Sequence, residues 1–222
     1  MEKDRREQRR FRVPDVETAF DESERRQLDA IEAAVEERLS GKRLRHVKEV
    51  ARTALWLADL YGVDPFEAQA AGLLHDWDKK LPVEELWDKA LAAGVVERRD
   101  ERIEPLLHGW TAAATLPEVF PELPPEVFTA VGRHTVGSVD MRPLDMVVYL
   151  ADMIEPGREG EPLDDLRSRV GKVPLDALFA LGCRRSLEYL LEGGRYMYPG
   201  GVDVWNAWCD HMPTLGVGPA ML

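Results

Sequence analysis

Apolar residues recur along most of this chain at the three- and four-residue spacing of amphipathic helices. Two faces show the spacing, one of Leu28, Ile31, Val35 and Leu39 and the other of Val47, Val50, Ala51, Ala54 and Ala58. Asp64 precedes Pro65 as a helix cap, with Glu67 in the capping-box position. Further apolar stretches open at Pro82, Pro125, Pro143 and Pro174. The pattern predicts about eight to ten helices.

Strand signals are weak, because no stretch alternates apolar and polar residues between tight Asn-Gly or Asp-Gly turns. Helix breakers fall at Gly62, Gly94, Pro117 to Pro125, Gly137, Pro156-Gly157 and Gly193-Gly194. Their spacing is typical of loops between packed helices rather than of an interdomain linker. We therefore predict an all-α bundle, with residues 1–40 as a helical extension, 41–212 as the main domain and 213–222 as a C-terminal tail.

Composition narrows the class of protein. The 222 residues are 45% hydrophobic and 32% charged, which is typical of one globular domain. Neither an apolar run of about eighteen residues nor a secretory leader is present, so we expect a cytoplasmic protein without a membrane partner. The net charge of −12 disfavours a nucleic-acid partner. The basic run from Lys3 to Arg12 is interleaved with acids and gets no chemical role, and Cys183 and Cys209 are expected to be reduced thiols.

Four histidines, His46, His75, His108 and His134, lie near the predicted ends of helices among apolar neighbours. Each one alone is better explained as a satisfied core or surface histidine. His75 and Asp76 change this, because the apolar run AQAAGLLHD brings an imidazole and a carboxylate into the interior together. Coordination of a cation would stabilise such a pair, and mixed nitrogen and oxygen ligands suit iron, manganese, zinc or nickel.

Asp152 is a second carboxylate in an apolar setting, since it interrupts the helix MVVYLADMIEP. Its partner is either a nearby arginine or a metal ion that it shares with His46, His75 and Asp76. Arg43 precedes His46 by three residues and Lys79 follows Asp76 by three. Each is either a phosphate contact or an ordinary surface cation.

The order His, His-Asp, two further His and Asp resembles the HD superfamily of phosphohydrolases. Several strings make the chain, from about Arg43 to Asn206, similar to the bacterial YqeK-type symmetrical bis(5'-nucleosyl)-tetraphosphatases: RLRHV, LLHDWDK, LLHGW, RHTVGSVDM and VVYLADMIEPGR. The last string, which ends at Arg158, is the most specific. The resemblance implies an all-α HD-domain helical bundle that cleaves diadenosine tetraphosphate into two ADP molecules.

The resemblance also implies roles for individual residues. The metal ligands would be His46, His75, Asp76 and Asp152, holding one or two divalent ions, iron first, with manganese, cobalt or nickel as alternatives. The substrate contacts would be Arg43, Lys79, His108, His134 and Arg158. The catalytic set would be Asp76, Lys79, His108 and His134, with Asp76 orienting a water molecule and the two histidines completing a second metal position or donating a proton to the leaving phosphate.

Asp78 departs from the family pattern, which has a small or apolar residue there, and we expect this carboxylate to bind Lys79 or Lys80. Two other functions stay open. One is another HD-type nucleotide phosphatase or phosphodiesterase, and the other is a regulatory helical module that keeps a metal only for stability. A homodimer is also left open.

Overall fold

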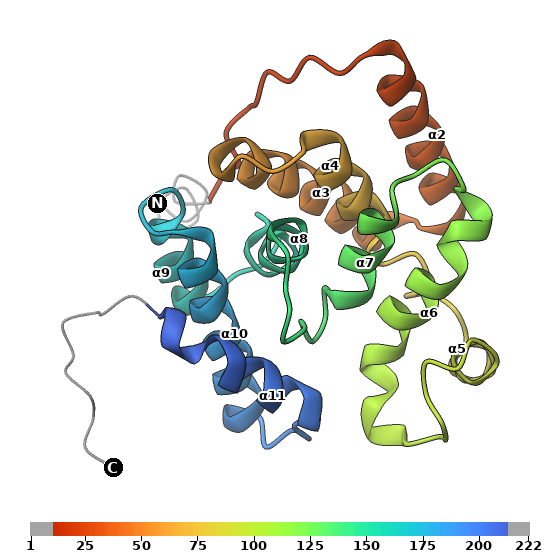
Figure 1. Ribbon diagram of the computed structural model, residues 1–222, viewed down its shortest axis with the longest axis vertical. Coiled ribbons are helices and arrows are strands. Elements are labelled where there is room, and N and C mark those ends of the chain that lie inside the picture. The colour runs from red at the N-terminus through yellow and green to blue at the C-terminus, as the bar shows by residue number, and fades with distance from the viewer. Residues whose placement is uncertain (1–10, 213–222) are drawn as a thin grey trace, which may run out of the picture.

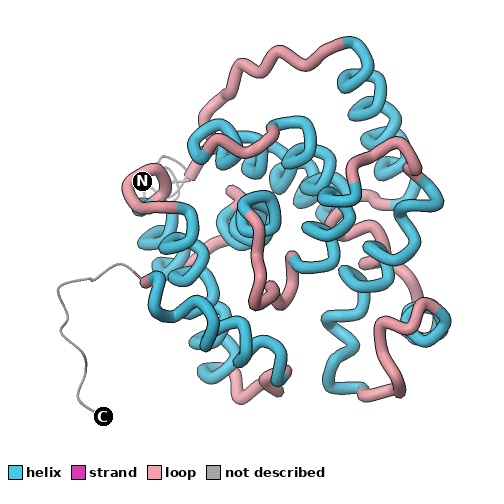
Figure 2. Tube along the Cα trace, in the orientation of Figure 1, coloured by secondary structure: helices cyan, strands magenta, loops and turns pink. Residues whose placement is uncertain are grey.

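The computed structural model describes residues 11–212, and this range contains ten α-helices, two short 3-10 helices and no strand (Figure 2). The all-α prediction is confirmed. The α-helices are α2 (Glu22–Arg38), α3 (Gly41–Tyr61), α4 (Pro65–Leu74), α5 (Val83–Ala92), α6 (Glu104–Val119), α7 (Pro125–Arg133), α8 (Pro143–Ile154), α9 (Glu161–Arg169), α10 (Leu175–Glu192) and α11 (Pro199–Trp208). The predicted tail 213–222 and residues 3–10 of the basic run lie outside the described range.

Helix α8 lies at the centre of the bundle, where Figure 1 shows it almost end-on, and it contacts α3, α4, α7 and α10. It is buried nearly all round, because its sequence is apolar from Leu144 to Ala151 except for Asp145. Asp145 accepts hydrogen bonds from Arg133 at 2.7 Å and from the backbone of Arg142 at 2.9 Å. A buried carboxylate so paired lets a central helix keep a charge in the core.

Helices α3 and α4 cross at their smallest residues. A side-chain carbon added at Gly72 would lie 2.7 Å from the Cα atom of Ala51, so only glycine permits this approach. The apolar face predicted for residues 47–58 is buried in this crossing, and Asp64 caps α4 by accepting from the backbone of Glu67 at 2.9 Å. The close contact brings the end of α4, where His75 lies, against the start of α3.

Helix α6 differs from the prediction, because it continues through Pro117 to Val119 instead of breaking there. Pro117 lies in the last turn, where its missing N–H removes a single helical hydrogen bond. Leu116 beside it is fully buried, and its carbonyl accepts from the backbone of Phe120 at 2.8 Å. Burial of that turn outweighs the local preference of proline, so the loop is confined to the residues between α6 and α7.

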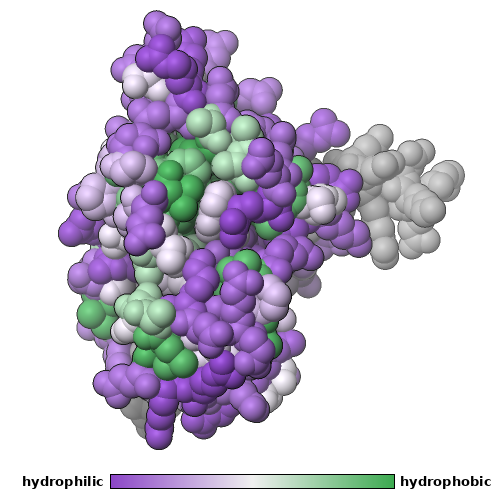
Figure 3. All heavy atoms as spheres, turned by 90° about the vertical axis from the view of Figure 1, so that its right-hand side faces the viewer, coloured by the Kyte–Doolittle hydropathy of each residue, from purple (hydrophilic) through white to green (hydrophobic). Residues whose placement is uncertain are grey.

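Helix α2 packs its predicted apolar face, Leu28, Ile31, Val35 and Leu39, into the main core, whereas α5 and α6 share a smaller cluster around Trp87. The face of the molecule that carries these peripheral helices is mainly hydrophilic, with separate apolar areas (Figure 3). Among residues 11–212 no helix is long and apolar enough to cross a membrane. Both cysteines are free thiols. The division of the chain at residue 40 stays a prediction.

Candidate metal and phosphate site

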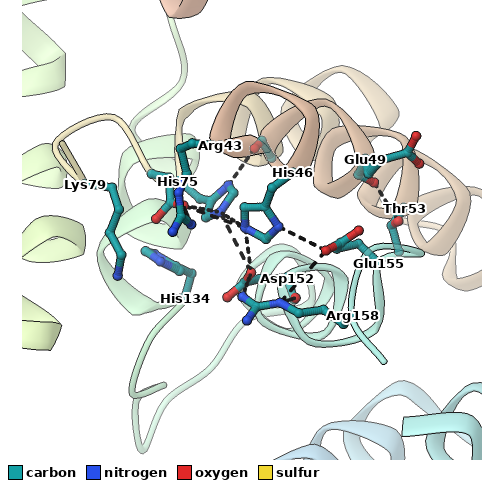
Figure 4. Close-up of polar contacts among 12 residues, drawn as sticks. Arg43, His46, Glu49, Thr53, His75, Lys79, His134, Asp152, Glu155 and Arg158 are labelled. Carbon is teal, nitrogen blue, oxygen red and sulfur yellow. Dashed lines mark hydrogen bonds and ion pairs between the residues drawn. The ribbon is translucent and has the colours of Figure 1, made fainter. Parts of the chain in front are cut away.

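Four histidines from four helices converge beside α8, and Figure 4 labels three of them, His46, His75 and His134. His46 lies in the second turn of α3, His75 caps the C-terminus of α4, His108 lies in the second turn of α6, and His134 caps α7. Their rings lie edge to face in a chain, with centroids 5.2 Å, 5.0 Å and 5.0 Å apart. The structure thus brings together histidines that are far apart in the sequence, which only the helix packing could show.

Three of these rings are oriented by their own helices. Each Nδ1 lies beside a backbone carbonyl three residues earlier: His75 2.8 Å from Gly72, His108 3.0 Å from Pro105, and His134 2.7 Å from Val131. An Nδ1–H that donates to a carbonyl leaves the Nε2 atom unprotonated, with its lone pair available. All three Nε2 atoms therefore face the same space as ligand donors.

His46 is oriented by a different partner, the buried carboxylate of Glu155, whose Oε1 lies 3.1 Å from the ring Nδ1. The backbone N–H of Gly157 also donates to Glu155. A side-chain carbon at Gly157 would lie 2.8 Å from both carboxylate oxygens, so a larger residue at 157 would force the Glu155 carboxylate to move from this position. Sequence reasoning missed Glu155, although the IEPG string contained its signal.

Asp76 lies between the two pairs of histidines. Its Oδ2 is 3.5 Å from His75 Nε2 and 3.7 Å from His46 Nε2, and its Oδ1 is 3.2 Å from His108 Nε2. The side chain is almost fully buried, and Arg43 Nη1 lies 2.5 Å from Oδ2. The two oxygens of this carboxylate therefore face different imidazoles: Oδ2 faces His75 and His46, and Oδ1 faces His108.

Asp152 closes the site from α8, with its Oδ1 atom 3.1 Å from His46 Nε2 and 3.9 Å from His75 Nε2. The same oxygen accepts from Arg158 Nη2 at 2.7 Å. Asp152 therefore pairs with an arginine, as one sequence interpretation predicts, and it lies among the histidines with which the other interpretation predicts a shared ion. Arg158 lies on the loop after α8, directly after the predicted helix breaker Pro156-Gly157.

A cavity of about 450 Å³ opens over these groups, and its walls carry the cations that the sequence singled out. Lys79 lies 3.3 Å from His108 Nδ1, and Lys79, Arg43 and Arg158 line the cavity together. Arg185 of α10 adds a fourth cation that sequence reasoning missed, because nothing in its local sequence distinguishes it from the neighbouring Arg184. The arrangement can bind a ligand with several negative charges.

The protonation states differ among the histidines of the cluster. Burial lowers the pKa of His134 to about 3 and also lowers the pKa of His108, so both rings are neutral at neutral pH. Burial acts to lower the pKa of His46 too, but its hydrogen bonds to Asp152 and Glu155 outweigh burial and raise the pKa to about 9. Burial acts to raise the pKa values of Asp76 and Asp152, yet the neighbouring histidines hold both below the ordinary value.

These donors fit a divalent cation. His108 and His134 point their Nε2 atoms at each other across 3.1 Å, and both atoms carry lone pairs because each Nδ1–H is used by a carbonyl. A shared cation turns such a contact between two acceptors into attraction. Three groups of residues could each hold an ion, because the ligand atoms within each group lie within 4.8 Å of one another. The groups are His46, His75 and Asp76; His75, His134 and Asp152; and Asp76, His108 and His134.

The expectation that Asp78 binds Lys79 or Lys80 is wrong. Its carboxylate lies 2.7 Å from Lys89 Nζ and 3.5 Å from Arg38 Nη2, away from the histidines. On the turn that follows His75, Asp76 and Lys79 face the cavity, whereas Asp78 faces α2 and α5. Asp78 thus adds no charge to the cavity.

The sequence profile of the HD domain matches residues 43–157, which is the part of the chain that contributes all four histidines. This chain belongs to the HD domain family. HD domains bind divalent metal ions, and the histidine and aspartate groups described above can hold one.

Several curated proteins are similar to the chain over most of its length. A Staphylococcus aureus protein named symmetrical bis(5'-nucleosyl)-tetraphosphatase is 27% identical over 81% of this chain and 93% of its own length. A Bacillus subtilis protein of the same name is 26% identical over 78% of this chain and 93% of its own. The crystal structure of an HD superfamily hydrolase from Clostridium acetobutylicum, described as involved in NAD metabolism, aligns with a TM-score of 0.73 at 27% identity and covers 82% of this chain and 96% of that one.

Proposed function

We propose that this protein hydrolyses dinucleoside tetraphosphates with the help of a divalent metal, and that it cleaves diadenosine tetraphosphate into two ADP molecules. The observation that carries the proposal is the position of Asp76, which faces a different part of the histidine cluster with each carboxylate oxygen while four cations line the same cavity. The names and coverage of the relatives support the substrate.

The metal ligands in this proposal are His46, His75, Asp76 and Asp152, with iron as the native ion and manganese, cobalt or nickel as alternatives. His108 and His134, together with Asp76, form the position of a second ion. A divalent ion held there would lower the pKa of a coordinated water far below that of bulk water and polarise a phosphoryl oxygen.

The other residues bind and orient the tetraphosphate bridge. Arg43 and Arg158 offer planar forks of donors, and each already contacts a carboxylate of the cluster, so phosphate oxygens bound by them lie next to the metal ligands. Lys79 stabilises charge on the phosphate that leaves. Because the pKa values of His108 and His134 are lowered, both rings are neutral, and a ligand role suits them better than proton donation.

Product analysis tests the function. Purified protein is loaded with iron, manganese, cobalt or magnesium and given diadenosine tetraphosphate, guanosine analogues, mononucleotides and cyclic dinucleotides, and the products are separated. ADP as the sole product of diadenosine tetraphosphate supports the proposal, whereas AMP together with ATP contradicts symmetric cleavage. Turnover confined to mononucleotides or cyclic dinucleotides favours another HD-type phosphatase, and metal binding without any turnover favours a regulatory module.

His75→Ala provides the matched control for the assay, since His75 is fully buried among the predicted ligands. We expect this variant to lose bound metal and turnover together. Wild-type turnover in it would remove the basis of the proposal. The cytoplasmic location, the lack of a nucleic-acid partner and the homodimer remain predictions, and light scattering of the purified protein decides the last.

A further inference from the structure

A second cavity of about 620 Å³ adjoins the cavity that holds the histidines and cations. Residues of α6, α10 and α11 line it, and the two cavities share a wall that consists of Pro105, Thr135, Tyr149, Ser186 and Tyr189. We propose that this second cavity binds one nucleoside of the substrate, with the purine inside it and the sugar at the shared wall. The inference rests on the proposed function and names the part of the protein that recognises the nucleoside.

The lining of the second cavity suits a flat apolar ring better than a phosphate. Aliphatic side chains contribute much of it, among them Leu106, Val136 and Val204. Large apolar surfaces that a fold leaves uncovered beside a charged site are typical of ligand pockets, in which a few polar groups orient an otherwise apolar ligand.

Tyrosine rings form the rim of this cavity. Tyr189 and Tyr196 remain 57% and 38% exposed, although both are large and partly apolar. Arg195 lies over the ring of Tyr189 at 4.1 Å, and Arg102 lies over Tyr196 at 4.4 Å. The arginines hold the two rings in place, and aromatic rings so held bind bases by stacking regardless of which base is present.

Thr135 supplies the polar contact at the shared wall. Its Oγ1 atom is buried, and in residues 11–212 it has no hydrogen-bond partner. Two other hydroxyl groups of the shared wall have a partner, because Tyr149 and Ser186 form a hydrogen bond of 2.7 Å with each other. Buried hydroxyls without a partner are rare in folded proteins, so this one needs a partner that residues 11–212 do not supply. A sugar hydroxyl or the oxygen that joins sugar to phosphate fits its position.

The order of these features along the two cavities matches the order of groups in a nucleotide. Phosphate oxygens meet Arg43, Lys79 and Arg158, the sugar meets Thr135, and the base meets the tyrosine rim. Thr135, the proposed contact to the sugar, directly follows His134, which faces the proposed second metal position. An inorganic polyphosphate would use only the first of the two cavities.

Gly201 of α11 allows a direct test, because it lines the second cavity and a side-chain carbon there would meet only Val136 Cγ1, at 3.8 Å. Gly201→Leu places a side chain in the cavity, and leucine favours the helix more than glycine does. Calorimetry with the manganese-loaded protein compares ADP with inorganic pyrophosphate as ligands. We expect the variant to lose at least about tenfold in affinity for ADP and to keep its affinity for pyrophosphate.

Ala207→Leu is the matched control, since Ala207 lies exposed on the same helix away from the cavity. The control is expected to bind both ligands as the wild type does. Equal ADP affinity in the wild type and Gly201→Leu would overturn the inference, and so would an equal loss for ADP and pyrophosphate, which indicates general damage.

Thr135→Val is the second test, because a merely structural role predicts no loss when a hydroxyl without a partner is replaced by a methyl group of similar shape. We expect ADP affinity to fall about fivefold and pyrophosphate affinity to stay unchanged. Unchanged ADP affinity would remove Thr135 from the binding site. Failure of the wild type to cleave diadenosine tetraphosphate would defeat the proposed function, whereas normal cleavage with unchanged ADP affinity in both variants would defeat only the nucleoside pocket.

Discussion

Asp76 and Asp78 lie two residues apart on the turn after α4, and both are buried, with exposed fractions of 2% and 0%. Asp76 faces three histidines and Arg43, whereas Asp78 faces Lys89 and Arg38, which come from α5 and α2. The first carboxylate lies among groups whose lone pairs converge on one space. The second lies between two cations that complete its charge.

This difference teaches that burial of a carboxylate does not by itself indicate a metal site. Asp78 ties two peripheral helices to the core, and its partners already neutralise it. Asp76 has one arginine beside it, but three histidine nitrogens also surround its carboxylate. This cluster of several metal-binding groups distinguishes a candidate metal site from a buried ion pair. The comparison predicts different consequences for the same substitution at the two positions.

Asp76→Asn is expected to have the largest effect on metal affinity. The change keeps the shape of the side chain but removes the charge that both groups of histidines share. We expect affinity for manganese to fall by more than about a hundredfold, beyond the loss that is typical for residues that only orient a ligand. Calorimetry or inductively coupled plasma analysis of the dialysed protein measures it. Metal content equal to that of the wild type would remove Asp76 from the ligand set.

Glu155→Gln is expected to have the next largest effect. The amide keeps a hydrogen bond to His46 but no longer holds the ring with a negative charge, so His46 becomes a weaker ligand. We expect a loss of about 10–100-fold in metal affinity, with little change in the affinity for pyrophosphate relative to metal-loaded wild type. Glu161→Gln is the control, since Glu161 is exposed at the start of α9 and lines neither of the two cavities. Equal metal affinity in both variants would show that Glu155 stabilises only the turn at Gly157 and does not affect His46 as a ligand.

The pH dependence of metal binding gives a smaller effect. Without metal, hydrogen bonds to Asp152 and Glu155 outweigh burial and raise the pKa of His46 to about 9, so the ring holds a proton at neutral pH that a bound ion must displace. The apparent affinity should therefore rise as pH increases toward about 9, by about tenfold per pH unit for one released proton, and should then level off. Calorimetry in buffers of different ionisation enthalpy counts the protons. Affinity that does not change from neutral pH upward would contradict this.

Asp78→Asn is expected to leave metal affinity unchanged and to reduce stability instead. Lys89 and Arg38 lose their shared anion, but both are partly exposed and can turn to solvent, so the free energy of unfolding should fall by about 1–3 kcal/mol. Urea unfolding of the metal-free protein measures it. A loss of metal affinity as large as that of Asp76→Asn would erase the distinction between the two carboxylates.

Sequence reasoning was most successful where the cause is local. The faces formed by Leu28 to Leu39 and by Val47 to Ala58 are buried as predicted, because helical periodicity is a property of neighbouring residues. Asp64 caps α4 for the same reason. Pro117 was misplaced because packing of Leu116 outweighs the preference of proline at the end of a helix.

The partners of charged groups could not be found in this way. Glu155 and His46 are 109 residues apart, so their contact depends on how α3 packs against α8. Asp78 was expected to pair with its neighbours Lys79 and Lys80, yet it pairs with residues of α2 and α5. Contacts over such separations have no periodic signal, and side chains on adjacent residues of a turn point in different directions.

The sequence by itself determined that this protein is a helical bundle and that an imidazole and a carboxylate enter its interior side by side at His75 and Asp76. It did so because helix propensity, capping and apolar periodicity act over a few residues. Only the tertiary structure decided which carboxylate meets the histidines, which glutamate orients His46, and that an apolar cavity opens beside the charged one. Those outcomes depend on the crossing of helices that lie far apart in the chain, where close packing at Gly72 and Ala51 brings the donors together.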